Sequence, residues 1–137
     1  MLKYIIGYLG TGLAFAGLDA VWLTLAGPKV YRPTLDPVLA DKLAVGPAVA
    51  FYLIYVFGML VLAVLPAARE GGWRMAALSG AVLGITAYAA YDLTNQATLK
   101  VWATRITLMD IGWGAFATAT ASVAGVFAYR WALEKWG

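Results

Sequence analysis

The chain contains no cysteine and no histidine among its 137 residues, and only 12% of its residues are charged. Without cysteine it forms no disulfide and has no thiolate to act as a nucleophile or metal ligand. Without histidine it has no imidazole to bind haem or zinc and no histidine general base. Ionic chemistry therefore falls to aspartate, glutamate, lysine, arginine and tyrosine. We expect no catalytic motif, no metal site and no cofactor.

The residues that are present are mostly apolar. Hydrophobic residues make up 63% of the chain, and its mean hydropathy is +0.77. This composition excludes an ordinary soluble domain. A membrane-spanning helix needs about 20 mostly apolar residues, so four helices with short connections use the whole length. We predict an all-α membrane protein with a single domain over residues 1–137, folded as an antiparallel four-helix transmembrane bundle.

Four apolar stretches carry this prediction. The expected spans are residues 4–26, 47–65, 75–93 and 107–131. Gly27-Pro28 is expected to end the first span and Pro66 the second, because proline cannot continue a helix. Lys3 and the apolar residues after it resemble a signal peptide, but no convincing small-residue cleavage site follows. We therefore interpret the first stretch as a retained helix.

The three connections differ in character. Residues 28–45 are rich in proline and charge, so we expect them outside the lipid, with Asp36-Pro37 capping a short interfacial segment between helices 1 and 2. Residues 67–74 have the composition of a tight turn, which makes the second and third spans antiparallel neighbours. Residues 94–106 mix polar and apolar side chains and are expected to form an interfacial or re-entrant helix.

Two stripes of residues recur at four-residue spacing on the third and fourth spans. They comprise Gly80, Gly84, Tyr88 and Asp92 on the third span, and Ala117, Ala121 and Gly125 on the fourth. Small residues let the backbone of a neighbouring helix approach closely, whereas lipid gives them no packing reward. We therefore expect the face with Gly80, Gly84 and Tyr88 to pack inward.

Three acidic residues fall near span ends that meet at one side of the membrane if the spans alternate in direction. A carboxylate at the bilayer centre costs roughly 2.5 to 3.5 kcal/mol on insertion scales, so such acids usually face a partner or a water-filled cavity. The candidate ligand-binding or proton-binding residues at this mouth are Asp19, Asp92, Asp110, Asn95, Lys100, Arg105, Tyr88, Trp22, Trp102 and Trp113. We expect Asp19 to face inward and to pair, directly or through water, with Lys100, Arg105 or a polar residue such as Asn95.

Each acid also has a structural interpretation. Asp19 can form an interhelical hydrogen bond or ion pair that only holds the bundle together. Asp92, at a helix end, can reach headgroup water or the ammonium group of Lys100. The segment Thr107-Leu-Met-Asp110 fits a capping box, in which both side chains bond to helix amides.

Tryptophans accompany two of the acids. Asp19-x-x-Trp22 and Asp110-x-x-Trp113 share one spacing, as the inverted repeats of transporters do, although two such short matches are better explained by coincidence. Together with Trp102, these rings can line a pocket for a chain or ring. An interfacial belt also holds tryptophan for packing reasons alone, and we favour that interpretation.

The chain resembles a known family in three motifs. They are Asp19-x-x-Trp22, Tyr91-Asp92-Leu-Thr-Asn95-Gln-Ala-Thr98-Leu-Lys100-x-Trp102, and Asp110-x-x-Trp113-Gly114. The pattern resembles an uncharacterised family of bacterial four-helix membrane proteins, the domain of unknown function 2177, over nearly the whole chain. The resemblance implies a multi-pass protein of the bacterial inner membrane and carries no known activity.

Three functions compete at this stage. The first is small-ligand or proton-coupled binding and transport, with the three aspartates as acceptors and Lys100 or Arg105 as counter-ions. The second is an accessory or assembly subunit whose small-residue stripes dock a larger membrane complex. The third, ranked last, is a lipid-modifying enzyme that uses an acid pair, so an enzyme is not the favoured interpretation.

The expected surroundings follow from charge and length. Basic residues are scattered singly, which favours anchoring at membrane lipid over binding to nucleic acid. Four short helices are few for a transporter, so we expect a homo-oligomer or a larger membrane complex. The short basic connection and the basic tail favour cytoplasmic positions for both termini.

Overall fold

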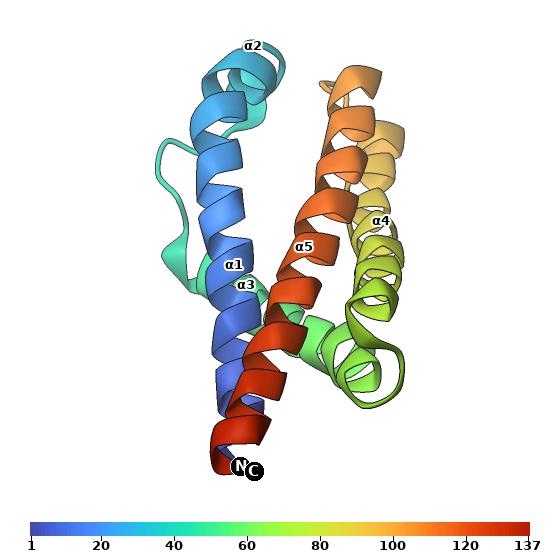
Figure 1. Ribbon diagram of the computed structural model, residues 1–137. Coiled ribbons are helices and arrows are strands. Elements are labelled where there is room, and N and C mark those ends of the chain that lie inside the picture. The colour runs from blue at the N-terminus through green and yellow to red at the C-terminus, as the bar shows by residue number, and fades with distance from the viewer.

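The computed structural model describes residues 1–137, and every regular element in it is helical (Figure 1). The long helices are α1 (Leu2–Ala26), α3 (Val45–Met59), α4 (Gly72–Thr98) and α5 (Thr104–Trp136). Helices α4 and α5 lie side by side, α1 packs against α5, and both termini emerge at one end of the molecule (Figure 1). The expected all-α fold is confirmed.

Three helical stretches are long and apolar enough to cross a membrane. They are Leu2–Val38, Val45–Thr98 and Thr104–Trp136. The middle stretch contains both α3 and α4, which are separated by a sharp turn at Gly72. The expectation of several membrane-spanning helices is therefore confirmed.

Large apolar side chains cover the outside of the helices. They include Leu9 and Leu13 on α1, Ile54 and Phe57 on α3, Leu78 and Val82 on α4, and Phe116 and Phe127 on α5. Polar residues such as Thr11, Thr118 and Ser122 are buried between the helices instead. An apolar exterior around a partly polar interior is suited to the hydrocarbon core of a membrane, which offers polar side chains no hydrogen-bond partner.

Helix α5 is central to the packing, because it holds 12 of the 28 buried residues and contacts both α1 and α4. Its buried positions recur every three or four residues, which gives one continuous inner face. Ala117, Ala121 and Gly125 all belong to that face. The second small-residue stripe is thus buried by contacts within the chain.

Glycines on α4 set its distance from α5. A Cβ atom on Gly80 would lie 2.8 Å from the Cα of Ala119, and one on Gly84 would lie 2.7 Å from the carbonyl carbon of Gly114. Neither position has room for a larger residue unless the helices move apart. The ring of Tyr88 packs against Gly114 in the same way. The expected inward packing of this face is confirmed.

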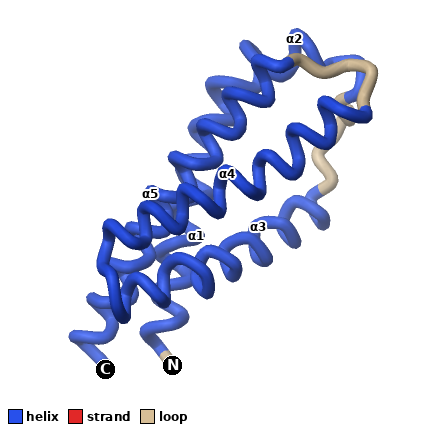
Figure 2. Tube along the Cα trace, turned by 90° about the vertical axis from the view of Figure 1, so that its right-hand side faces the viewer, coloured by secondary structure: helices blue, strands red, loops and turns tan.

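The first connection differs from the expectation, because the helix does not end at Gly27-Pro28. It continues through three short turns: η1 (Gly27–Tyr31, π-type), α2 (Arg32–Leu35) and η2 (Asp36–Val38, 3₁₀). Pro28 stands at the start of η1, where a missing N–H costs little. Residues 39–44 form no helix and run as a loop to α3 (Figure 2). The interfacial helix expected after Asp36 is therefore reduced to a single turn.

Pro66 likewise does not end the second helix. Two further π-type turns extend α3, η3 (Leu60–Val64) and η4 (Ala67–Gly71). Such turns widen a helix locally and often accompany the kink that proline imposes. The chain reverses at Gly72, whose φ of 72° is a left-handed conformation that glycine adopts freely. Arg130 of α5 steadies this turn, because its Nε and Nη2 donate to the carbonyl oxygen of Ala68 at 3.2 and 3.1 Å.

Residues 94–106 do not form the expected re-entrant helix. Helix α4 continues to Thr98, and α5 begins at Thr104. Thr107 consequently lies inside α5, whose N-cap is Ala103 without a side-chain bond. The expectation of a capping box between Thr107 and Asp110 was wrong for this reason.

The polar side chains of this stretch bond to one another instead. Gln96 Nε2 donates to Thr104 Oγ1 at 2.9 Å, and Thr107 Oγ1 donates to Gln96 Oε1 at 2.7 Å. Trp102 Nε1 donates to Thr107 Oγ1 at 2.9 Å. These bonds tie the end of α4 to the start of α5, which explains polar residues so close to two apolar helices.

Candidate functional site

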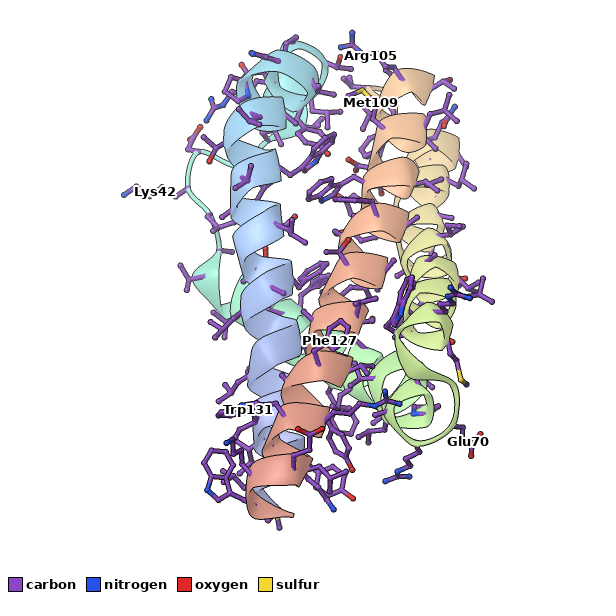
Figure 3. All side chains as sticks on the ribbon, in the orientation of Figure 1. Lys42, Glu70, Arg105, Met109, Phe127 and Trp131 are labelled. Carbon is purple, nitrogen blue, oxygen red and sulfur yellow. The ribbon has the colours of Figure 1, made fainter.

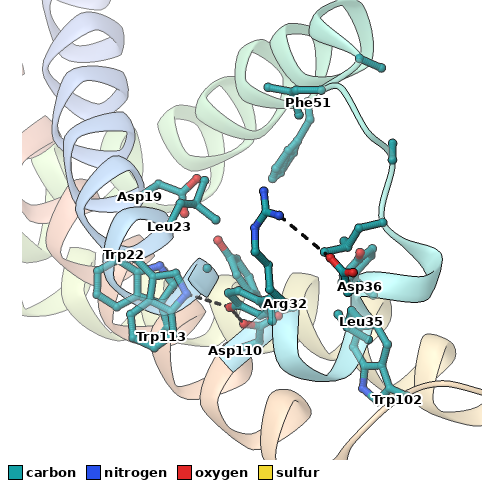
Figure 4. Close-up of a pocket in the computed structure, with 18 of the residues that line it drawn as sticks. Asp19, Trp22, Leu23, Arg32, Leu35, Asp36, Phe51, Trp102, Asp110 and Trp113 are labelled. Carbon is teal, nitrogen blue, oxygen red and sulfur yellow. Dashed lines mark hydrogen bonds and ion pairs between the residues drawn. The ribbon is translucent and has the colours of Figure 1, made fainter. Parts of the chain in front are cut away.

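A cavity of about 1030 Å³ lies toward the end of the molecule opposite to the termini. Figure 3 shows Arg105 and Met109 at this end, and Glu70 and Trp131 toward the other. The cavity is bounded by α1, α4 and α5, by the start of α3, and by the first connection (Figure 4). Most of its lining residues are hydrophobic.

Aromatic rings form one wall of the cavity. Trp22 of α1 and Trp113 of α5 stack with their centroids 4.7 Å apart and their planes at 7°. Trp102 meets Tyr91 edge-on at 6.1 Å. All four rings line the cavity. The tryptophans thus lie at the cavity, where the pocket interpretation expects them.

The two Asp-x-x-Trp motifs come together at this wall. Asp19 and Asp110 both line the cavity, and their tryptophans, Trp22 and Trp113, form the stacked pair. The two motifs, whose shared spacing was attributed to coincidence, are thus neighbours in the structure. The structure shows what the two motifs share, namely one acid and one ring each at the same cavity.

Asp110 is held by a chain of side-chain hydrogen bonds. The hydroxyl of Tyr31 donates to Asp110 Oδ1, and Trp22 Nε1 donates to the Tyr31 oxygen at 2.8 Å. Tyr31 lies in η1, which exists only because the helix continues past Pro28. The irregular turn after α1 therefore positions the donor for an acid on α5.

Asp92 lies behind Asp110 and is fully buried. Neither of its oxygens has a hydrogen-bond partner in the chain, although the carboxyl group of Asp110 lies nearby. A buried carboxylate without a donor or a cation is costly, whereas a protonated carboxyl group costs much less. Asp92 is therefore a candidate for a proton-holding acid beside the cavity wall.

Asp19 is half-buried and accepts a hydrogen bond from the hydroxyl of Tyr52 on α3. It does face a partner, as expected, and the partner is a polar residue, although not Asn95. The only ion pair in the chain joins Arg32 to Asp36. Of the alternatives for Asp19, the structure therefore shows the polar partner and not a basic counter-ion.

Three of the expected site residues lie away from the cavity. Lys100 and Arg105 are exposed, Asn95 is half-buried, and none of them lines it. The expected re-entrant segment would have brought them to the cavity. In the structure, Asn95 lies near the end of α4, Lys100 in the short loop that follows, and Arg105 at the start of α5. The structure brings together the other candidates, namely Asp19, Asp92, Asp110, Tyr88, Trp22, Trp102 and Trp113.

The first connection supplies the outer wall, which sequence reasoning missed. Arg32 and Asp36 line the cavity and pair at 4.0 Å, and Asp41 and Lys42 line it from the loop. Figure 4 shows Arg32 extending beside the cavity toward Phe51. Nothing in the composition of residues 28–45 distinguishes a cavity wall from a solvated connection.

Tyr31 and Tyr52 are the other residues that sequence reasoning missed. The second expected span, residues 47–65, holds no charge and supplied no candidate site residue. Its tyrosines nevertheless point inward: Tyr52 bonds to Asp19, and the hydroxyl of Tyr55 lies 2.8 Å from Thr118 Oγ1. A hydroxyl in an apolar span needs a partner, and that signal was present.

We predict that Tyr52 and Asp19 are energetically coupled. Tyr52→Phe and Asp19→Ala should each lower stability, and the double variant should lose less than the sum, by about 0.5 to 2 kcal/mol. Thermal unfolding in detergent measures this cycle. The matched cycle of Asp19→Ala with Lys100→Met should be additive, and strictly additive losses for the tyrosine would contradict the bond.

The arrangement provides groups that can bind a ligand and hold a proton. No group of three acids is close enough to hold a metal ion. No nucleophile motif adjoins the acids. What the inner part of the cavity offers is the carboxyl groups of Asp19 and Asp110, several ring faces and the buried carboxyl group of Asp92 beside them.

Comparisons with known proteins identify one relationship. A family model described as predicted membrane protein, DUF2177, matches residues 4–127. No curated protein and no solved structure matches the chain.

Proposed function

Since the chain belongs to the DUF2177 family of predicted membrane proteins, we propose that it binds a small ligand at one face of the membrane and links this binding to a proton. The family match confirms the resemblance seen in the sequence. It assigns no activity, so the proposal stands on the cavity and its acids.

The observation that carries the proposal is the carboxyl pair of Asp92 and Asp110 at the cavity wall. Asp110 faces the cavity, and Asp92 is buried beside it without any hydrogen-bond partner. We infer that a proton neutralises one of these two acids, and a ligand that brings a donor or a positive charge to Asp110 would compete with it. Tyr31, Tyr88, Tyr91 and Asp19 are the other titratable groups near the two acids.

The membrane arrangement is part of the proposal. We infer that the middle helical stretch crosses twice, because it reverses at Gly72, and that the chain forms an antiparallel bundle of four spans. Both termini then lie on one side, which we propose to be the cytoplasm of a bacterial cell whose inner membrane holds the protein. Four helices are few for transport, so we propose that it works as a homo-oligomer in lipid.

The two other functions have less support. Docking to a larger complex was suggested by the small-residue stripes, and these stripes are occupied by contacts between α4 and α5 and between α1 and α5. A lipid-modifying enzyme needs an acid and a base placed for catalysis. Asp92 is fully buried and does not line the cavity, so it is not aimed at a substrate position.

We predict that the cavity admits water-soluble reagents. The chain has no cysteine, so single cysteines can be introduced without further changes. Ala87 lines the cavity, whereas Ile85, two residues before it on α4, is exposed on the outer surface. In lipid nanodiscs, Ala87→Cys should react with a water-soluble methanethiosulfonate, and Ile85→Cys should stay unreacted because it faces lipid.

Mass spectrometry of the intact protein follows this labelling directly. A reaction at least about ten times faster at position 87 is the expected result, since only the cavity gives charged reagents access. If both cysteines remain unreacted, the cavity is closed to water, and the proposed function is lost.

A further inference from the structure

The cavity wall carries more acidic than basic side chains. Its acids are Asp19, Asp36, Asp41 and Asp110, and its bases are Arg32 and Lys42. Asp92 adds another acid directly behind the wall. An anionic ligand would therefore meet repulsion from most sides, whereas a cationic ligand would meet complementary charge.

The two bases do not neutralise the inner acids. The side chain of Arg32 is 71% exposed, and its guanidinium already pairs with Asp36. Asp19 and Asp110 receive only tyrosine hydroxyls, from Tyr52 and Tyr31. The inner part of the cavity thus offers acceptors that have no cation of their own.

The aromatic wall favours the same kind of ligand. The stacked rings of Trp22 and Trp113 line the cavity beside Asp19 and Asp110. The face of an indole ring is electronegative and attracts cations, by about 0.5 to 2 kcal/mol depending on desolvation. Ring faces and carboxylates together bind an organic cation, because the charge meets the acids while the apolar groups meet the rings.

We propose that the ligand is an organic cation with an apolar body, bound between Asp19, Asp110 and the stacked pair of Trp22 and Trp113. This inference rests on the proposed function, since it names the class of ligand that the same cavity takes. A free amphiphilic cation and the ammonium group of a lipid share this chemistry.

The first experiment compares two reagents of opposite charge on Ala87→Cys in the full chain. One methanethiosulfonate carries trimethylammonium and the other carries sulfonate, and each rate is divided by its rate with a free thiol in solution. We expect the cationic reagent to be favoured by about tenfold, which is about 1.4 kcal/mol. Equal normalised rates, or a preference for the anion, would overturn the inference while leaving an accessible cavity.

The second experiment uses ligands that bind without reacting. Tetraphenylphosphonium and tetraphenylborate have nearly the same size and shape but opposite charge. The cation should slow labelling of Ala87→Cys, and the anion should not. Protection by the borate ion alone, or by neither ion, would contradict the proposal. If neither methanethiosulfonate reacts at all, the proposed function and this inference fall together.

Charge variants assign the preference to particular residues. Asp19→Asn and Asp110→Asn should each reduce the preference for the cation by about three- to tenfold, whereas Glu134→Gln, which removes a charge near the C-terminus, should leave it unchanged. Arg32→Gln tests the inference through an exposed residue and should increase the preference. If the ratio of the two labelling rates is the same in all these variants, the charge of the cavity does not select the ligand.

The source of the cation is distinguished by the lipid used. The labelling is carried out in nanodiscs of phosphatidylglycerol, with and without phosphatidylethanolamine. Slower labelling when phosphatidylethanolamine is present would assign the ammonium group to a lipid, and unchanged labelling together with protection by tetraphenylphosphonium would assign it to a free cation.

Discussion

Leucine in place of Gly84 is expected to prevent stable folding of the protein, with a loss of at least about 3 kcal/mol. A Cβ atom at this position would overlap the carbonyl group of Gly114, and it would come within 2.9 Å of Thr118 Oγ1. The backbone of Gly114 cannot relieve the overlap by rotating away, as a flexible side chain can. Helices α4 and α5 would therefore have to separate. That separation would also disturb Tyr88, whose ring packs against Gly114.

Gly112 provides the control for this substitution. It lies in α5 near the same contact, but a Cβ atom there would meet nothing within 4 Å. Gly112→Leu should therefore leave stability unchanged or raise it slightly, because leucine is the better helix former. Thermal unfolding in detergent and the elution profile of both variants measure the difference. A stable Gly84→Leu protein would show that the two helices are not in close contact.

The sequence predicted the parts of the fold that depend on local composition. Apolar stretches with few charges predicted the helices, and glycines at four-residue spacing predicted the close contact at Gly80 and Gly84. Both signals depend only on residues within one helix or on directly neighbouring helices. They can therefore be recognised without knowing how the rest of the chain folds.

Helix ends were predicted less well, because proline was given too much weight. Pro28 lies within a π-type turn and Pro66 between two of them, and these turns let the helix continue. The polar residues 94–106 were read as a separate segment, although their side chains bond one another across the ends of α4 and α5. Local rules do not show where a side chain finds its partner in another element.

The candidate site shows the same division. The acids and tryptophans were identified as a group, because an acid in an apolar stretch is costly and therefore informative. Their partners were not, since Tyr31 and Tyr52 carry no charge and lie 79 and 33 residues from the acids that they bond. A basic counter-ion was expected because electrostatics suggested one, yet a hydroxyl donor satisfies a carboxyl group as well.

Replacing Asp92 by asparagine is expected to abolish an infrared band that belongs to a protonated carboxyl group. In the native protein, Asp92 is fully buried without a hydrogen-bond partner or a paired cation, so we expect the neutral, protonated form there. Asparagine is neutral and has nearly the same shape, so the fold should survive. Asp19→Asn is the control, because a tyrosine hydroxyl supplies the hydrogen bond there.

Removing Asp110 should have the larger effect on stability. Asp110→Ala leaves the hydroxyl of Tyr31 without its acceptor and empties the space beside the buried carboxyl group of Asp92. An unsatisfied buried polar group costs roughly 1 to 3 kcal/mol, and the emptied space adds to that loss. Asp110→Asn should cost less, since its amide oxygen can still accept from Tyr31. Equal losses for alanine and asparagine would contradict the bond between Tyr31 and Asp110.

The same band also tests whether binding and protonation are linked. An organic cation beside Asp110 favours the ionised carboxylate, so tetraphenylphosphonium should weaken the carboxyl band of the native protein as it occupies the cavity. The band should return when the cation is washed out. A carboxyl band that stays constant while the cation protects Ala87→Cys from labelling would mean that the cavity binds its ligand without exchanging the proton of the pair.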